Sequence, residues 1–450
     1  MSLIISVSGL RGVVGRTLTP ETAQNYARAF SEQSPDGLFV ITRDSRSSGL
    51  MLAEAVHTAL NHAGRSTIDA GIAATPTLGI LIRRLNAAGG IQISASHNPS
   101  EYNGMKLFTH EGRVIPKIPG EKVLQCYHRR KTAPSADSTG SRGTKTLCDD
   151  PVSAHLEAVL ATVNAEAVRE RKFHVLLDSN RGAGGVLGRP LLEKLGCKVT
   201  VLGETPDGQF EHPPEPVETN LQPVFAKVRE CQADIGFCQD PDADRLAVID
   251  AAGRFLGEEY TVAMCTDHLL RTRGRGAVVT NCSSSRMTEE ITQKHGGTFF
   301  RSPVGEANVV DQMIARNAVF GGEGNGGPID PQVGFVRDSF VGMAQILDAM
   351  TARNLSAAAL ADELPRYVIV KRKFDLPHEK AAEAFAALQR FYRNFPIDTM
   401  DGCRIDKPDA WLLVRMSNTE PTARIIAEAP TDAGANRFCD EAEDVLNGVV

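Results

Sequence analysis

Short apolar runs alternate with longer segments of helical periodicity along the first two-thirds of this chain. The apolar runs have the length of strands, and the segments between them carry apolar residues at helical spacing. The expected strands are Leu38–Thr42, Ser66–Asp69, Gly90–Ser94, Phe173–Leu177, Lys198–Leu202, Ala233–Phe237, Leu246–Ile249, Ala277–Thr280 and Thr298–Arg301. The expected helices are Gly49–Ala63, Leu78–Leu85, Pro151–Val163, Tyr260–Leu270 and Arg286–Lys294, with another ending near Gly196. This alternation is typical of parallel sheets covered by helices.

The pattern changes twice along the chain, and the changes predict domain boundaries. Residues 131–145 (KTAPSADSTGSRGTK) are polar and small, as in a loop or boundary. From about Tyr367 onward, strand-like and helix-like segments no longer alternate strictly, which favours a small α+β domain. Although 450 residues suggest about three domains from length alone, this change favours four. The predicted boundaries are 1–146, 147–253, 254–366 and 367–450, and the first three units share a similar rhythm.

Composition and charge exclude some partners. The formal net charge of -6 and the pI near 6.0 give no electrostatic reason to expect nucleic acid or an anionic membrane surface. A local site can still be basic inside an acidic protein. The nine cysteines form no CxxC pair, and neither a signal peptide nor an apolar stretch of membrane-spanning length is visible. We therefore expect a cytoplasmic protein that contacts neither nucleic acid nor membrane.

The segment SASHNPSEYNGMK, residues 94–106, follows an apolar run and places Ser96 in a polar loop. Catalytic side chains are often presented just beyond the ends of strands. Ser96 can act as a nucleophile only if it is activated or carries a transferable group. His97 and Lys106 could handle protons and negative charge beside it. The alternative interpretation is a polar turn that ends at a proline.

The segment QDPDADRLAVID, residues 239–250, carries Asp240, Asp242 and Asp244 at alternate positions. An extended backbone would point all three carboxylates the same way, and they would repel one another without a cation. Hard oxygen ligands favour magnesium or calcium over zinc. An EF-hand loop is excluded because its sixth and twelfth positions are Arg245 and Ala251. A solvated acidic turn is the alternative.

Two further segments carry groups suited to a phosphosugar. In GGEGNGG, residues 321–327, glycines allow close approach of the backbone, and Glu323 with Asn325 suits vicinal sugar hydroxyls. In RMSNTEPTARI, residues 415–425, Arg415 can pair with a phosphate and Arg424 is a possible second cation. A turn containing Ser417, Asn418 and Thr419 could cradle the same phosphate. A flexible loop and a hairpin loop are the respective alternatives.

Two shorter segments lie in the first predicted domain. SGLRG, residues 8–12, places Arg11 in a glycine-flanked turn, where it faces either a phosphate or solvent. RDSRSSG, residues 43–49, is expected to cap the helix that begins near Ser48.

Taken together, SASHNP with NGMK, DPDADR, GEGNGG and RMSNTEP resemble the four signature loops of the α-D-phosphohexomutase family, in the family's order. Each loop alone is weak or moderate, but four in order are specific, and the resemblance spans nearly the whole chain. It implies three related mixed α/β domains and a smaller C-terminal α+β domain around a central cleft, each domain giving one loop. It also implies a phosphosugar mutase that interconverts hexose 6-phosphate and hexose 1-phosphate through a phosphoserine enzyme and a bisphosphate intermediate.

The resemblance also implies roles for individual residues. Ser96 matches the serine that carries the phosphoryl group, and Asp240, Asp242 and Asp244 match the Mg²⁺ ligands, completed by a serine-phosphate oxygen. Arg11 and Arg245 match arginines near the transferring phosphate, and His97 and Lys106 match groups that handle protons and stabilise charge. Glu323 and Asn325 match the binders of sugar hydroxyls. The clamp on the other phosphate is matched by Arg415, Ser417, Asn418 and Thr419, with Arg424 as a further cation.

Departures from the commoner family pattern concern the sugar. Asn325 stands where serine is more usual, Gly327 where bacterial relatives often carry histidine, and Glu306 where some mannose-type enzymes have histidine. The substrate expected is glucosamine phosphate, with a phosphomannomutase or phosphoglucomutase as the alternative. The resemblance further implies a hexose 1,6-bisphosphate activator, and we expect a monomer or homodimer.

Two functions of other classes are alternatives to a mutase. A dehydrogenase is suggested by strand 173–177 followed by RGAGG, but Leu187 stands where G-x-G-x-x-G requires its third glycine. A non-catalytic sugar-phosphate binder would bind ligand and form no bisphosphate. The presence of Ser96, Lys106 and the three aspartates argues against it.

Overall fold

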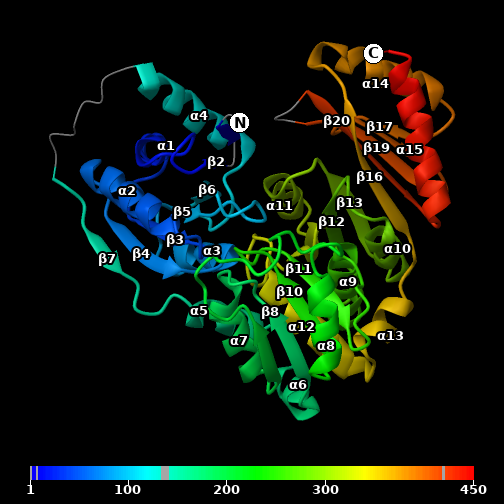
Figure 1. Ribbon diagram of the computed structural model, residues 1–450, viewed down its shortest axis with the longest axis horizontal. Coiled ribbons are helices and arrows are strands. Elements are labelled where there is room, and N and C mark those ends of the chain that lie inside the picture. Colours follow the sequence, from blue (N-terminus) through cyan, green and yellow to red (C-terminus); the bar gives the residue numbers. More distant parts are fainter. Residues whose placement is uncertain (1–2, 7–8, 133–140, 418–420, 450) are drawn as a thin grey trace.

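The computed structural model describes residues 3–6, 9–132, 141–417 and 421–449, which form four sheets with flanking helices (Figure 1). The first sheet has seven strands in the order β1-β2-β6-β5-β3-β4-β7. Its elements are β1 (Ile4–Ser6), β2 (Gly9–Val13), α1 (Pro20–Glu32), β3 (Phe39–Arg43), α2 (Gly49–His62), β4 (Thr67–Ile72), α3 (Thr75–Arg84), β5 (Gly89–Ile93), β6 (Tyr102–Thr109), α4 (Lys117–Thr132) and β7 (Lys145–Leu147). The β7 strand extends one residue beyond the predicted boundary at 146 and still pairs with β4.

Helices cover both faces of the first sheet because its strands are apolar on both sides. Tyr26 of α1 and Tyr127 of α4 share one apolar cluster with Ile41 and Ile91 of the sheet. On the other face, α3 packs its buried residues against a second cluster that contains Val40 and Phe108. Strands buried on both faces are the ones that appear as continuous apolar runs in the sequence.

The second and third sheets each have four strands, in the orders β11-β10-β8-β9 and β13-β12-β14-β15. The second unit contains α5 (Ser153–Leu160), α6 (Ala165–Arg171), β8 (His174–Asp178), α7 (Gly184–Lys194), β9 (Lys198–Leu202), α8 (Gln222–Glu230), β10 (Ile235–Gln239) and β11 (Leu246–Asp250). The third contains α9 (Glu258–Arg273), β12 (Ala277–Asn281), α10 (Met287–Lys294), β13 (Thr298–Ser302), α11 (Glu306–Ala315), β14 (Phe320–Glu323), β15 (Gly327–Ile329), α12 (Ser339–Arg353) and α13 (Ala357–Asp362).

Helix α12 joins the second and third units into one core. Every residue from Ser339 to Met350 is buried. One apolar cluster contains Phe340 and Ile346 of this helix together with Val175 of the second sheet and Phe320 of the third. A helix that is apolar all round must be enclosed on all sides. Sequence periodicity did not reveal this helix, since a fully buried helix has no polar face to set the period.

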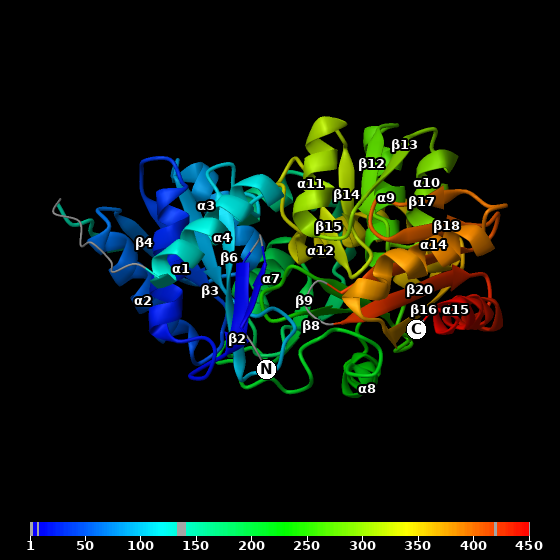
Figure 2. The same cartoon turned by 90° about the horizontal axis from the view of Figure 1, so that it is seen from above.

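The fourth unit is smaller and entirely antiparallel, with the strand order β16-β20-β19-β18-β17. Its elements are β16 (Val368–Asp375), the 3₁₀ turn η1 (His378–Lys380), α14 (Ala381–Phe391), β17 (Ile397–Asp398), β18 (Cys403–Asp406), β19 (Trp411–Met416), β20 (Thr422–Ala429) and α15 (Asp432–Asn447). Helices α14 and α15 cover one face. On the other face Trp411, Leu413 and Ile426 pack on Cys282 of the third unit, so this sheet lies beside α10 and β13 in Figures 1 and 2.

A shared hairpin relates the first three units. In each, three parallel strands are followed by one antiparallel strand: β6 beside β5, β11 beside β10, and β15 beside β14. The expectation of three related mixed α/β units and a smaller α+β unit is confirmed, and each of the first three sheets adds antiparallel strands to the parallel ones that the alternation predicts. The turn of each hairpin carries one of the predicted loops, since Ser96, Asp242 and Asn325 each fall between the third and fourth strands.

Candidate active site

The serine loop lies between β5 and β6 and holds Ser96 in the left-handed backbone region, with φ of 49°. That conformation is costly for a residue with a side chain and needs support from its surroundings. Part of the support comes from Ser94, whose Oγ accepts from the Ser96 backbone N–H at 2.8 Å and donates to Asp44 Oδ2 at 2.7 Å. The nucleophile predicted from the sequence is therefore held by a buried polar scaffold.

Arg46 completes that scaffold. Its guanidinium donates to the carbonyls of Ser96, Asn98 and Pro99, each at 2.6 Å, and to the carboxylate of Asp44 at 3.0 Å. The expectation that residues 43–49 cap helix α2 is wrong, because Ser48 makes no capping hydrogen bond with its side chain. The segment instead fixes the loop that presents Ser96. A purely local pattern could not reveal carbonyl partners about fifty residues away.

The acidic loop follows β10 and gathers three fully buried carboxylates, those of Asp240, Asp242 and Asp244. It is a turn, with Ala243 at φ 55° and its N–H bonded to the carbonyl of Asp240. The expected extended backbone is thus wrong, although one oxygen from each aspartate lies within 4.8 Å of the others. The Oδ1 atom of Asp240 accepts from the backbone N–H groups of Asp244 and Arg245, which holds the turn closed.

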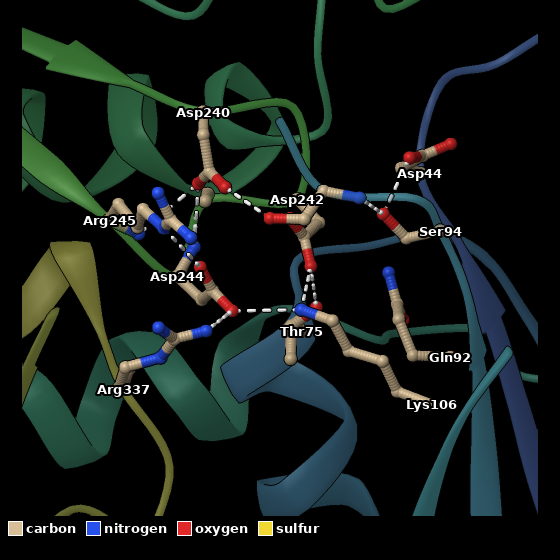
Figure 3. A network of polar contacts seen from close by, with 12 residues as sticks. Asp44, Thr75, Gln92, Ser94, Lys106, Asp240, Asp242, Asp244, Arg245 and Arg337 are labelled. Atoms are coloured by element: carbon tan, nitrogen blue, oxygen red, sulfur yellow. Dashed lines mark hydrogen bonds and ion pairs between the residues drawn. The ribbon is translucent and has the colours of Figure 1, made fainter. Parts of the chain in front are cut away.

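Side chains from the first and third units converge on these carboxylates of the second unit (Figure 3). Ser96 Oγ donates to Asp240 Oδ2 at 2.7 Å. Lys106 Nζ lies 2.6 Å from Asp242 Oδ2 and 2.8 Å from Asp244 Oδ2, and Thr75 also donates to Asp242 Oδ2. The strand β6 that carries Lys106 pairs with β5, so one hairpin delivers both the serine and the lysine to the acidic loop.

The protonation of these groups follows from burial and mutual charge. Burial, followed by the charges of Asp244 and Asp242, raises the pKa of Asp240 well above its usual range. For Asp244, burial acts in the same direction, but Arg337 and Lys106 together lower its pKa below the ordinary value. For Lys106, burial lowers the pKa, and the two aspartates more than offset it. Lys106 therefore stays charged.

The donor set fits a hard divalent cation. Within the described residues, the Oδ1 atoms of Asp242 and Asp244 are buried and accept no hydrogen bond. Buried carboxylate oxygens without donors are costly unless a cation lies against them. Oxygen-only ligands of this kind suit magnesium or calcium. Asp240, Asp242 and Asp244, with the Ser96 hydroxyl beside Asp240, therefore fit such a cation.

His97 and two arginines surround the serine. The Nδ1 atom of His97 lies 3.4 Å from Ser96 Oγ. Burial, then the charges of Arg245 and Arg11, lowers the pKa of His97 to about 2, so its imidazole is neutral. Arg11 donates to the side chain of Asn98 in the serine loop. Arg245 Nε lies 4.0 Å from Asp244 Oδ1. The structure thus brings together all five residues predicted for catalysis.

The sugar loop packs directly on the acidic loop. Gly326, at φ 83°, accepts from the backbone N–H of Leu246 at 2.8 Å. Glu323 is buried, and its Oε1 accepts from the side chain of Asn281 at 2.7 Å and from the N–H of Gly305 at 3.1 Å. Asn325 is half-buried, and its Oδ1 accepts no hydrogen bond within the described part of the chain. Both predicted sugar binders therefore lie next to the cation site.

The clamp is built differently. Arg415 is buried near the end of β19 and donates from Nε to Asp401 at 3.1 Å, and Asp401 also accepts from the N–H of Val304 in the third unit. Arg424 on β20 is exposed and directly opposite Arg415 in the strand register. The N–H of Ser417 bonds to the carbonyl of Thr422. Asn418 and Thr419 lie outside the described residues.

Among the predicted residues, those on the three hairpins meet, whereas the described clamp residues remain on the fourth sheet. Sequence reasoning missed three residues that organise the centre: Thr75, Arg46 and Arg337. The guanidinium of Arg337 contacts both Asp244 and Glu323. Of the three, only Arg46 lies in a segment that the sequence analysis singled out, RDSRSSG. An aspartate and an arginine two residues apart in that segment could have indicated a role other than a helix cap.

The RGAGG turn that suggested a dehydrogenase serves packing. A Cβ on Gly184 would lie 2.1 Å from the side chain of Gln239, and one on Gly182 would lie 2.8 Å from Pro241. These glycines let α7 approach the acidic loop closely. No helix within the described ranges is long and apolar enough to cross a bilayer.

Fold and site together fit an enzyme that transfers a phosphoryl group on a small phosphorylated substrate. Models of the four domains of the phosphoglucomutase/phosphomannomutase family match this chain. Alpha/beta/alpha domains I, II and III match residues 3–133, 153–253 and 258–367, and the C-terminal domain matches residues 367–445. The chain therefore belongs to the phosphoglucomutase/phosphomannomutase family.

Individual relatives are similar over their full length. A "Phosphoglucomutase/phosphomannomutase" of Thermococcus kodakarensis is 35% identical, covering 98% of this chain and 97% of its own. A "Probable phosphoglucosamine mutase" of Pyrococcus horikoshii is 33% identical, covering 100% and 99%. A crystal structure of a phosphoglucomutase/phosphomannomutase family protein from Burkholderia thailandensis superposes with a TM-score of 0.85 at 25% identity, covering 99% of this chain and 98% of that one.

Proposed function

We propose that this family member interconverts hexose 6-phosphate and hexose 1-phosphate through a phosphorylated Ser96. The observation that supports this most directly is the hydrogen bond from Ser96 Oγ to Asp240, which lies beside Asp242 and Asp244. Each of these two neighbours keeps one buried oxygen that accepts no hydrogen bond within the described residues. A serine fixed against a cation site is suited to accept and return a phosphoryl group.

The proposed reaction consists of two transfers. The oxygen–phosphorus bond of phosphoserine breaks as a sugar hydroxyl forms a new one, and the hydroxyl proton passes to a base of the chain. The departing serine oxygen takes up a proton. The bisphosphate then turns over, and Ser96 Oγ gives up that proton as it bonds to the other phosphorus, while the sugar oxygen that leaves is protonated in turn. The neutral imidazole of His97, 3.4 Å from Ser96 Oγ, is placed to take up the hydroxyl proton, and the charged Lys106 is placed to stabilise the developing charge, with Arg11 and Arg245 beside the phosphate. A hexose 1,6-bisphosphate would load the serine at the start.

The cation proposed is Mg²⁺, held by Asp240, Asp242, Asp244 and a serine-phosphate oxygen. When bound, it would neutralise charge on the phosphoryl oxygens. The residues of the chain position the groups: Arg46 fixes the serine loop, and Lys106 fixes the second oxygens of Asp242 and Asp244. Good alignment can lower such a barrier by about 7–11 kcal/mol.

The substrate proposed is glucosamine phosphate. Support comes from GEGNGG in the sugar loop and from the name of the Pyrococcus horikoshii relative. Glu323 and Asn325 would bind the sugar hydroxyls, and Arg415, Ser417, Asn418 and Thr419 would clamp the non-reacting phosphate, with Arg424 as an outer cation. Glucose and mannose phosphates form the alternative, which the name of the Thermococcus relative favours.

The test begins with covalent loading. The purified protein would be incubated with glucose 1,6-bisphosphate and Mg²⁺, and intact-mass spectrometry with peptide mapping would locate the phosphoryl group. We expect one phosphoryl group on Ser96 and none on the Ser96→Ala variant. Ser45→Ala is the matched control, because Ser45 is buried nearby and its Oγ makes no hydrogen bond within the described residues. Normal turnover by Ser96→Ala would refute the proposed nucleophile.

The substrate is tested by a panel. Glucosamine 6-phosphate, mannose 6-phosphate and glucose 6-phosphate would be compared by kcat/KM with the bisphosphate present. We expect the highest value for glucosamine 6-phosphate. A higher value for either other sugar would overturn the assignment of the substrate and leave the assignment of the reaction intact.

A further inference from the structure

Arg337 lies between the acidic loop and the sugar loop. It is not among the residues predicted to bind the cation or the sugar. It precedes helix α12, and only 7% of its surface is exposed. One terminal nitrogen donates to Asp244 Oδ2 at 2.6 Å and the other donates to Glu323 Oε2 at 2.8 Å. Figure 3 shows the guanidinium facing the carboxylate of Asp244 opposite Lys106. A single side chain therefore contacts a predicted cation ligand and a predicted sugar ligand.

The surroundings leave Arg337 little freedom. Its backbone N–H donates to Glu306 Oε1 at 2.8 Å, and its Nε lies 3.5 Å from Glu306 Oε2. A Cβ on Gly327 would lie 2.4 Å from Cδ of Arg337. The arginine stem thus runs through space that exists because residue 327 has no side chain.

We propose that Arg337 is a positioning residue that couples sugar binding at Glu323 to cation binding at Asp244. This inference rests on the proposed function of the same site. The guanidinium occupies Oδ2 of Asp244, and Oδ1 accepts no hydrogen bond within the described residues and is left for the cation. Residues that fix the second oxygen of a metal ligand orient the first and tune its affinity.

The geometry of arginine makes the coupling possible. The two terminal nitrogens belong to one rigid plane, so a displacement of Glu323 when a sugar binds turns the same group that holds Asp244. A lysine carries the charge at a single point and cannot hold both carboxylates in one fixed plane. Burial matters as well, because the low dielectric around Arg337 strengthens both contacts.

Coupling of this kind is reciprocal. If Mg²⁺ strengthens the binding of a sugar phosphate by some factor, the sugar phosphate strengthens the binding of Mg²⁺ by the same factor. Couplings between sites typically amount to about 5- to 150-fold. We expect a value within that range for the native protein and a value near one when the contact through Arg337 is lost.

The experiment measures binding without turnover. Unphosphorylated protein, verified by intact mass, would be titrated with glucosamine 6-phosphate by calorimetry, with and without saturating Mg²⁺. Without a phosphoryl donor no product forms, so the ratio of the two dissociation constants gives the coupling directly. A reverse titration with Mg²⁺, with and without the sugar phosphate, must give the same ratio.

Two variants break the contact by different routes. Arg337→Lys keeps the buried positive charge and removes the fork. Gly327→Ala keeps every charge and displaces the arginine stem. We expect both to reduce the coupling to about one. Arg273→Lys is the matched control: Arg273 makes a two-pronged contact with Asp330 at 2.9 and 2.7 Å, elsewhere in the third unit. We expect that variant to keep the native coupling.

The outcomes separate this inference from the proposed function. Native coupling in folded Arg337→Lys, or in folded Gly327→Ala, would overturn the role of Arg337. If one variant does not fold by circular dichroism, the other decides. A native protein that binds glucosamine, glucose and mannose 6-phosphates equally well with and without Mg²⁺ would also overturn it, because there would be nothing to couple. Failure of the native protein to bind any of these sugar phosphates would instead refute the proposed function.

Discussion

Two regions of the molecule hold their charged groups in opposite ways. The centre is the place where the three hairpin turns meet around Asp240, Asp242 and Asp244, and the clamp lies on the fourth sheet with Arg415 and Arg424. At the centre, carboxylates and positively charged side chains from separate units are buried against one another, as in the contact between Lys106 and Asp242. In the clamp, Arg415 is buried with one carboxylate partner, and Arg424 beside it is exposed. The centre is therefore held by several buried contacts between units, whereas among the described residues of the clamp Arg415 has one carboxylate partner.

This difference corresponds to two demands of a mutase. The transferring phosphate always meets the same serine, so its surroundings can be preorganised for a charged transition state. The non-reacting phosphate sits at either end of the sugar in alternate halves of the cycle. A clamp with fewer fixed partners accommodates both orientations. Perturbations at the centre should therefore change rate, and perturbations at the clamp should change affinity.

The largest effect is expected from loss of the cation site. Asp242→Asn, or chelation by EDTA, should lower kcat about a thousandfold, or about 4 kcal/mol, because charge on the phosphoryl oxygens is no longer neutralised. Steady-state kinetics after readdition of Mg²⁺ should show recovery for the chelated protein only. Asp348→Asn is the control, because Asp348 is buried away from the site. Its Oδ2 lies 3.0 Å from Nε2 of His268. Full activity after chelation would contradict the cation assignment.

The next effect contrasts two buried arginines. Arg46→Met should destabilise the protein by about 3–5 kcal/mol, because the Asp44 carboxylate loses its buried partner. It should also slow phosphorylation of Ser96 by freeing the serine loop. Arg404→Met removes a comparably buried arginine of the fourth unit, which donates to the carbonyl of Cys282 in the third unit.

Denaturant unfolding and mass-detected phosphorylation would compare the two variants. We expect both to be less stable and only Arg46→Met to be loaded slowly from the bisphosphate. Equal loading rates would remove the distinction between the centre and the periphery.

A smaller effect is expected at the clamp. Arg415→Met should raise KM about 10- to 100-fold, because it removes a charge-assisted hydrogen bond that contributes about 1.5–3 kcal/mol. The change in kcat should be smaller. Arg424→Met should change KM less than about fivefold, because an exposed pair contributes about 0–1 kcal/mol. Initial-rate kinetics would test both. A fall in kcat at unchanged KM for Arg415→Met would place this residue functionally with the centre.

The smallest effect is a pH dependence where the two regions face each other. Burial, opposed by the charge of Lys371 on β16, raises the pKa of Glu259 to about 8. A carboxyl whose folded pKa is raised binds its proton more tightly when folded, so its contribution to stability falls as pH rises from about 4.5 to 8. Glu259→Gln should flatten this dependence in thermal unfolding, by on the order of 1 kcal/mol. An identical slope in the variant would show that other groups cause it.

Contiguous motifs were predictable, and contacts between distant segments were not. Ser96, Lys106 and the three aspartates each stand in a short string whose residue types fit one chemistry, and the structure brings them together. Arg337 stands in FVRDSF, with no spacing signal, and its partner Asp244 lies 93 residues away. Arg46 was assigned to a helix cap for the same reason. The chemistry of a string can be read locally, but the group that orients it cannot.

The fold shows a similar division. Most parallel strands were expected close to their observed positions, as with Lys198–Leu202 for β9, whereas β7 and β14 were not expected. Of the antiparallel fourth strands, β11 was expected as a strand without its direction, because periodicity does not reveal strand direction, and residues 102–106 of β6 were assigned to a loop. The turn at Ala243 escaped prediction because alternating aspartates fit an extended chain equally well.

Helix α12 has a consequence for how the protein comes apart. Sequence matching divides the chain into blocks, yet the second and third blocks enclose the same helix and contribute to one apolar cluster. A fragment ending at residue 253 would leave the surface that receives Phe340 and Ile346 open to water. The boundaries of the matched domains therefore need not be boundaries of unfolding. We expect residues 153–253 and 258–367 to unfold in a single cooperative transition.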